Sequence, residues 1–316
     1  MTTTTHDENA AAIRAQVMRG IAGNRIPGMH FPGYFLDLKW LEVAGESARI
    51  VVPDGVHCRD ANGQMDIAAL AILADTALAT ATRLLTTPGA RLATVRMQMQ
   101  FTGEPVTGDV TADAHLLGFS SGTALRQSLT QGTLTAHGKP VCYASGEFVT
   151  LNPPPGVSLS PLPWQSDVAP PDAPDESQLH APERAILKAC DAALAKVTSH
   201  ASFIQHFWGG VPKRVAHGTT LRVPIGPHIG NRVGHVQGGI SFGIAAACAC
   251  AAVPSTMMLS SVSAWYISPG HGKALKVKSR TVHAGRSLAV VRTEITTAAG
   301  ERVLEAVTHH VARKRD

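Results

Sequence analysis

Two long apolar runs dominate the pattern of hydrophobic and polar positions, one in each half of the chain. They span residues 67–85 and 240–253 and consist mainly of Ala, Ile, Leu and Phe. Each run is too long for a strand and carries few polar residues, so the pattern predicts two buried helices.

Alternating apolar and polar residues, typical of strands, follow each predicted helix. Strands are expected at 92–101, 108–117, 124–133 and 141–151 in the first half, and at 257–266, 274–284, 288–297 and 303–312 in the second. Further strands are expected before the helices, at 35–43, 47–53 and 217–224, with helices at 9–19 and 182–198. The same α+β unit therefore occurs twice.

A proline-rich segment separates the two units. Pro-Pro-Pro-Gly, Pro-Leu-Pro-Trp and Ala-Pro-Pro-Asp-Ala-Pro-Asp follow one another in it. Such proline density cannot enter a helix or the interior of a sheet. We predict an N-terminal domain over residues 1–151, an extended linker over 152–181 and a C-terminal domain over 182–316.

Composition sets the class of protein and its partners. The chain has 316 residues, of which 44% are hydrophobic, enough for two domains, and only 16% are charged, which predicts large buried surfaces and a homo-oligomer. The net charge of +5 suits an anionic substrate. The only basic run is at residues 313–315, so nucleic-acid binding is not expected.

Cysteine usage and the N-terminus indicate the compartment. The five cysteines include no Cys-x-x-Cys pair, which favours a reducing environment without disulfides. The polar N-terminus and the lack of an uninterrupted apolar stretch of about 20 residues argue against a leader and a membrane partner. A cytoplasmic protein is predicted, with no metal site, because the histidines show no ligand spacing.

The segment before the second apolar run carries the most specific motif, Asn-Arg-Val-Gly-His-Val-Gln-Gly-Gly at 231–239. It resembles the signature of hotdog-fold acyl-CoA thioesterases of the phenylacetyl-CoA and 4-hydroxybenzoyl-CoA thioesterase superfamily. Asn231, Gly234, Gly238 and Gly239 match it, whereas Gln237 stands where the family has His. The resemblance implies two tandem hotdog domains, each a curved antiparallel sheet around a long central helix, packed as a pseudo-dimer.

The carboxylate of that family lies on the helix, nine residues after the His, where this half has Ala246. In the first half Asp75 lies nine residues after Asp66, the position equivalent to Gln237. In the family the carboxylate comes from one subunit and the Asn/His/Gly set from the other. The resemblance therefore implies one composite site between the halves.

The resemblance also suggests a role for each residue of that site. Asp75 would be the general base or, alternatively, the nucleophile, and the Gly238 amide would hold the oxyanion. The Gln237 amide cannot titrate near neutrality, so it would orient groups. Asn231 either lines the site or only forms a turn, and Thr94 would orient water.

The opposite pairing of residues lacks a base. It would combine Asp60 and Asp66 of the first half with Ala246 and Leu259 of the second. We predict that this second site is inert. Gly239 is expected to serve close helix–sheet packing.

The resemblance implies hydrolysis of an acyl-CoA without a further cofactor. Arg286 and Ser287 are the candidates for binding the CoA moiety. Two alternatives remain: a non-catalytic acyl-CoA-binding protein with degenerate sites, and an enoyl-CoA hydratase, whose Asp and His about five residues apart neither half shows.

Overall fold

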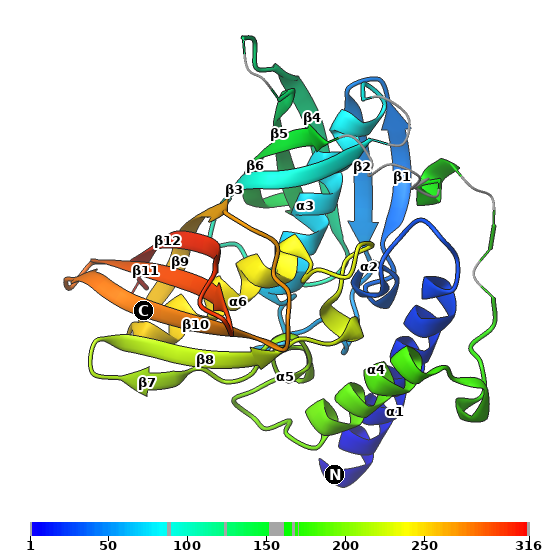
Figure 1. Ribbon diagram of the computed structural model, residues 1–316. Coiled ribbons are helices and arrows are strands. Elements are labelled where there is room, and N and C mark those ends of the chain that lie inside the picture. Colours follow the sequence, from blue (N-terminus) through cyan, green and yellow to red (C-terminus); the bar gives the residue numbers. More distant parts are fainter. Residues whose placement is uncertain are drawn as a thin grey trace.

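The computed structural model describes residues 2–86, 90–122, 125–151, 161–165, 168–169 and 171–314, with side chains from residue 7 onward. In this part of the chain twelve strands form one antiparallel sheet, in the order β1-β2-β4-β5-β6-β3-β9-β12-β11-β10-β8-β7. Two long helices, α3 (Ile67–Arg83) and α6 (Gly238–Ala252), pack against it and against each other (Figure 1).

The strand order of the second half mirrors that of the first. The strands of the first half are β1 (Lys39–Ala44), β2 (Ser47–Val52), β3 (Arg91–Phe101), β4 (Val110–Phe119), β5 (Gln127–Ala136) and β6 (Lys139–Leu151). Those of the second are β7 (Lys213–Val215), β8 (Gly218–Pro224), β9 (Met257–Tyr266), β10 (Ala274–Ala284), β11 (Leu288–Thr297) and β12 (Arg302–Ala312). The tandem double hotdog fold is therefore confirmed.

Further helices precede α3 in the first half and α6 in the second. They are α1 (Thr2–Asn24) and α2 (Phe31–Phe35) in the first half, and α4 (Ala181–Leu194) and α5 (Phe203–Trp208) in the second, where η3 (Pro227–Ile229) follows. The predicted strand at 35–43 is wrong at its start. His30 caps α2 by accepting a hydrogen bond from the Gly33 amide, and Phe35 ends this helix, buried among aromatic rings. The short elements α5 and β7 were not predicted.

The division of the chain at residues 151 and 182 stays a prediction. Residues 152–160, 166–167 and 170 of the expected linker lie outside the described residues. The described part of the linker contains two short 3-10 turns, η1 (Pro163–Gln165) and η2 (Glu176–Gln178).

Strands β3 and β9 join the halves into one sheet. Their register pairs Met97 with Ala264 and Met99 with Val262, and all four side chains are fully buried. The intervening pair, Gln98 with Ser263, points to the opposite face because side chains alternate along a strand. The junction is thus apolar on the helix side, and one hydrophobic core runs through both halves.

Helices α3 and α6 approach each other through glycine. A Cβ atom at Gly239 would lie 2.5 Å from the Ile72 nitrogen, and one at Gly243 would lie 2.4 Å from the Ala68 Cβ. Gly239 therefore serves contact between the helices, and the predicted helix–sheet contact is wrong. Helix α6 carries apolar or small residues on nearly every side, and most of them are buried.

We expect Gly243→Ala to destabilise the protein, although alanine normally favours a helix over glycine. The added methyl group would overlap Ala68, and such overpacking costs about 1–3 kcal/mol. Urea unfolding measures the loss. Gly230→Ala is the matched control, because the nearest atom would lie an ordinary 3.5 Å from the new Cβ. Equal stability of the two variants would contradict the close helix contact.

Candidate active site

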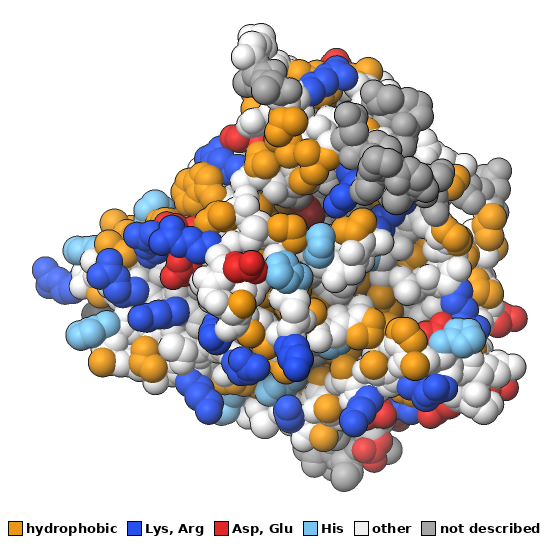
Figure 2. Space-filling model, viewed as in Figure 1, with side chains coloured by type: hydrophobic (Ala, Val, Ile, Leu, Met, Phe, Trp, Pro, Cys, Tyr) orange, Lys and Arg blue, Asp and Glu red, His pale blue; other side chains and the backbone are white. Residues whose placement is uncertain are grey.

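A cavity of about 470 Å³ opens between the two halves. One wall is the face of α3 that carries Asp75, Ala79 and Arg83, and the first residues of β3 continue it. The loops at 231–238 and 266–270 of the second half form the opposite wall. Figure 2 shows the surface hollowed between the halves, with basic side chains beside the hollow.

Asp75 is held by one hydrogen bond from each half. The Thr94 hydroxyl donates to its Oδ1 over 2.8 Å, and the Gln237 Nε2 donates to its Oδ2 over 3.0 Å. Burial raises the pKa of Asp75 to about 6, and the two hydrogen bonds oppose part of that rise. The carboxylate is thus fixed in position and more basic than an exposed one.

Gln237 has a second task that fixes which way its amide points. It is the N-cap of α6, and its Oε1 accepts a hydrogen bond from the Ile240 amide over 2.9 Å. Since the oxygen must face that donor, the Nε2 faces Asp75. A single side chain therefore caps one helix and binds the carboxylate carried by the other.

Gly238 is the first residue of α6 and lines the cavity. A Cβ atom there would lie 3.3 Å from Asp75 Oδ2, so the backbone runs directly beside the carboxylate. The Tyr266 hydroxyl donates to the Gly238 carbonyl over 3.1 Å. Among the described residues no acceptor binds the Gly238 amide, as is usual in the first turn of a helix.

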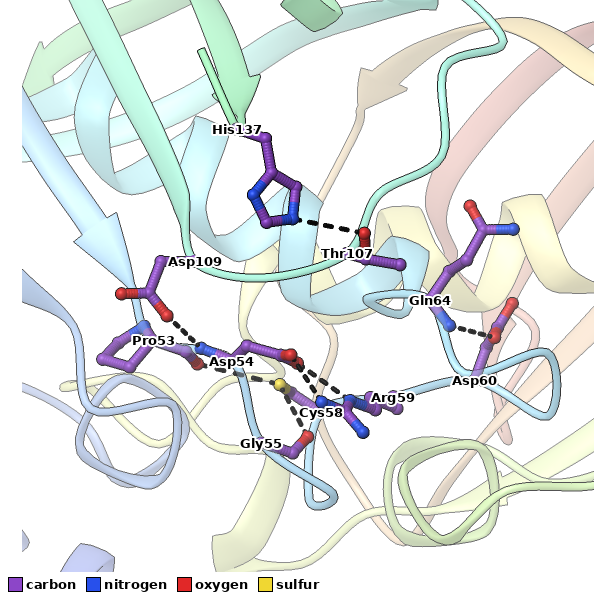
Figure 3. A network of polar contacts seen from close by, with 10 residues as sticks. All are labelled: Pro53, Asp54, Gly55, Cys58, Arg59, Asp60, Gln64, Thr107, Asp109 and His137. Carbon is purple, nitrogen blue, oxygen red and sulfur yellow. Dashed lines mark hydrogen bonds and ion pairs between the residues drawn. The ribbon is translucent and has the colours of Figure 1, made fainter. Parts of the chain in front are cut away.

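Asn231 lines the same cavity, but its side-chain oxygen accepts hydrogen bonds from its own loop. Its Oδ1 accepts hydrogen bonds from the Val233 and His235 amides, both over 3.0 Å. Asp60 forms the equivalent turn in the first half, where its Oδ1 accepts from the Gln64 amide over 3.0 Å (Figure 3). This repeated geometry supports the turn-forming role of Asn231.

The residues expected at the opposite site do not form a similar set. Asp66 caps α3 by accepting a hydrogen bond from the Ala68 amide over 2.8 Å. Ala246 stands fully buried at the position equivalent to Asp75, and Leu259 is partly buried against the core. No base occupies the helix position there, and the inertness of this site stays a prediction.

The structure does not bring Arg286 and Ser287 to the cavity. Both are exposed in the turn between β10 and β11, where the Ser287 carbonyl accepts a hydrogen bond from the Ala312 amide over 3.0 Å. Three other arginines, Arg83, Arg91 and Arg232, line the cavity instead. Of these three, only Arg83 could have been predicted from the sequence, because it lies two helical turns after Asp75 on the same expected helix.

Tyr266 and two tryptophans, Trp40 and Trp164, also line the cavity without having been predicted. The rings of Trp40 and Trp164 lie 5.5 Å apart. Their approach depends on where η1 packs, which sequence periodicity does not reveal. Burial raises the pKa of Tyr266 well above its ordinary value, so its hydroxyl stays a donor.

Two further properties concern metals and membranes. Within the ranges that the structure describes, no three His, Cys, Asp or Glu side chains are grouped closely enough to hold a metal ion. None of the described helices is long and apolar enough to cross a membrane.

Part of the chain matches a known family model. Residues 228–311, which contain the glycine motif, α6 and β9 to β11, match the family described as the acyl-CoA thioesterase N-terminal domain. The match lies in the C-terminal half of this chain and covers the more specific of the two repeats. No curated protein matches the chain.

Solved structures resemble both halves together. A candidate oleoyl thioesterase from Lactobacillus plantarum aligns with a TM-score of 0.55 and 12% identity, over 86% of this chain and 98% of its own. A candidate thioesterase from Novosphingobium aromaticivorans aligns with a TM-score of 0.51 and 14% identity, over 88% and 98%. At these identities the likeness concerns the fold. Residues 228–311 thus match a family of acyl-CoA thioesterases, and the chain as a whole shares the double hotdog fold of these structures.

Proposed function

We propose that the protein hydrolyses an acyl-CoA thioester to the free acid and CoA at the composite site between its halves. The observation that carries the proposal is the close approach of Asp75, in the first half, to Gln237 and Gly238, in the second half. Hydrolysis needs a base, a donor for the oxyanion and a means of placing water. In this proposal Asp75 is the base and the Gly238 amide is the donor. Thr94 and Gln237 hold the carboxylate that places the water.

Asp75 acts as the base in this proposal. It takes a proton from a water molecule whose oxygen bonds to the thioester carbon, and the Gly238 amide stabilises the resulting oxyanion. Collapse of this intermediate breaks the carbon–sulfur bond, and the proton on Asp75 passes to the CoA sulfur. The products are the carboxylic acid and CoA, and Asp75 returns to its charged form.

The environment of Asp75 suits this step. A pKa of about 6 leaves the carboxylate charged at neutral pH and makes it a stronger base than an exposed aspartate. Thr94 and Gln237 each bind one of its oxygens, which fixes the direction from which it approaches water. Attack by the carboxylate itself would instead release CoA and form a mixed anhydride with Asp75. If water then opens this anhydride at the Asp75 carbonyl carbon, the water oxygen stays in Asp75 and an Asp75 oxygen leaves with the acid. A single turnover in ¹⁸O-labelled water therefore separates this route, with label in the protein, from the general-base route, with label in the product.

The charge of the cavity favours a CoA ester. Among the residues that the structure describes, its lining contains three arginines and a single carboxylate, Asp75. Such a lining attracts an anionic substrate, as the net positive charge of the chain also does. Binding of the CoA phosphates by Arg91 and Arg232 is part of the proposal.

We expect Asp75→Asn to lower kcat by about a hundredfold or more, because general base catalysis contributes about 10²–10⁴-fold. Asp66→Asn is the matched control. It makes the same change on the same helix, also at a carboxylate whose pKa burial raises to about 6, and asparagine still caps a helix. A panel of acyl-CoAs, followed by thiol release, measures both variants.

Two outcomes would contradict this prediction. Equal slow turnover by the parent and Asp75→Asn, with the ester still bound, would make the protein an acyl-CoA-binding protein. Loss of activity in Asp66→Asn, with Asp75→Asn unaffected, would move the chemistry to the opposite site.

The pH dependence should follow the pKa of Asp75. Since the base must be deprotonated, kcat/KM should rise with pH and level off above about 6. Thr94→Val removes a hydrogen bond that stabilises the charged form, so the rise should move to higher pH, whereas Thr94→Ser should keep the parent profile. Identical profiles for all three proteins would mean that another group limits the rate.

A further inference from the structure

The cavity extends beyond the proposed catalytic residues along α3, toward its C-terminal end. Arg83 lies eight residues after Asp75, about 12 Å further along the helix axis. Both side chains line the cavity. A bound molecule can therefore touch the carboxylate with one part and the arginine with another.

The wall between these two residues is mostly apolar. Ala79 lies between them on α3, and Phe148 and Leu151 of β6 and the paired rings of Trp40 and Trp164 line the same cavity. Thr80 adds one hydroxyl, which accepts a hydrogen bond from the Trp40 Nε1 over 3.4 Å. An amide-rich chain such as pantetheine would lose hydration here with few partners in return, whereas methylene groups or a ring would not.

Arg83 is positioned by the protein but its charge is not neutralised. Its Nη1 donates to the Ala90 carbonyl over 2.8 Å, which fixes the guanidinium at the start of β3. Within the described residues no carboxylate forms an ion pair with it. The remaining N–H groups can bind a planar anion in a bidentate manner.

Neighbouring charge adds to the attraction for an anion. Burial and the positive charge of Arg232 lower the pKa of Arg83 to about 10, so the guanidinium stays charged at neutral pH. An anion bound by Arg83 would stabilise the charged form of its guanidinium. The carboxylate of Asp75 cannot serve, because it lies eight residues, or about 12 Å along the helix axis, from Arg83.

We propose that the acyl group of the substrate ends in a carboxylate, which Arg83 binds while Asp75 acts on the thioester. The substrate class is thus an acyl-CoA with an apolar body and a second, terminal acid group. This inference rests on the proposed hydrolase function and adds the substrate class to it. The same anion chemistry could come from a CoA phosphate, and the experiment separates these two sources.

The test compares suberoyl-CoA with octanoyl-CoA, which have chains of equal length and differ by the terminal carboxylate. We expect the parent to prefer suberoyl-CoA in kcat/KM, and Arg83→Gln to reduce this preference about tenfold or more, since a hydrogen bond to a charged group is lost. Activity of Arg83→Gln toward octanoyl-CoA and inhibition by free CoA should stay near the parent values. Both readouts also show that the variant is folded.

Two further variants keep the test decisive. If Arg83→Gln does not fold, Arg83→Lys takes its place. It retains the charge and should keep part of the preference for suberoyl-CoA. Arg96→Gln removes an arginine that pairs with Glu147 and does not line the cavity, so it should leave the preference unchanged.

Three outcomes would overturn the inference. The first is equal use of both esters by the parent, and the second is an unchanged preference in Arg83→Gln. The third is that Arg83→Gln loses activity equally toward both esters and is inhibited less by free CoA. This third outcome would assign Arg83 to a CoA phosphate. If the parent hydrolyses no acyl-CoA of the panel, the proposed function fails. Calorimetric binding of the two esters to Asp75→Asn then decides the inference by itself.

Discussion

The contact between α3 and α6 is the constraint on which the rest of the structure depends. Gly239 and Gly243 let the backbone of α6 approach Ile72 and Ala68 of α3 more closely than any side chain would permit. That approach brings the first turn of α6 beside the middle of α3, where Asp75 lies. The hydrogen bond from Gln237 to Asp75 is possible only because the helices are so close.

Both halves contribute residues to the candidate site. Each half keeps the loop turn, made by Asp60 or Asn231, and a polar cap on its long helix. The carboxylate remains only at Asp75 and the paired glycines only in α6. Substitution of the family's His by Gln237 is compatible with this arrangement, since an amide can cap the helix through oxygen while donating to the acid through nitrogen.

Sequence patterns predicted the fold well because both periodicities are strong. The strands β9, β10 and β11 begin and end where alternation indicated, and α6 follows directly from its apolar run. Phe35 was assigned to a strand although it ends α2, because a short capped helix and the first residues of a strand can have the same apolar composition. The core of the candidate site could be inferred from equivalent positions in the two repeats, whereas Trp164, Arg91 and Arg232 depend on tertiary packing that no local pattern records.

The continuous sheet has a consequence for how the molecule unfolds. A single hydrophobic core includes buried residues of both halves, and β3 and β9 each complete the other's hydrogen bonding. Neither repeat can open alone without exposing a sheet edge and an apolar helix face to water. The two repeats of the sequence therefore behave as one cooperative unit, and cleavage of the chain between them would leave two fragments that depend on mutual association to stay folded.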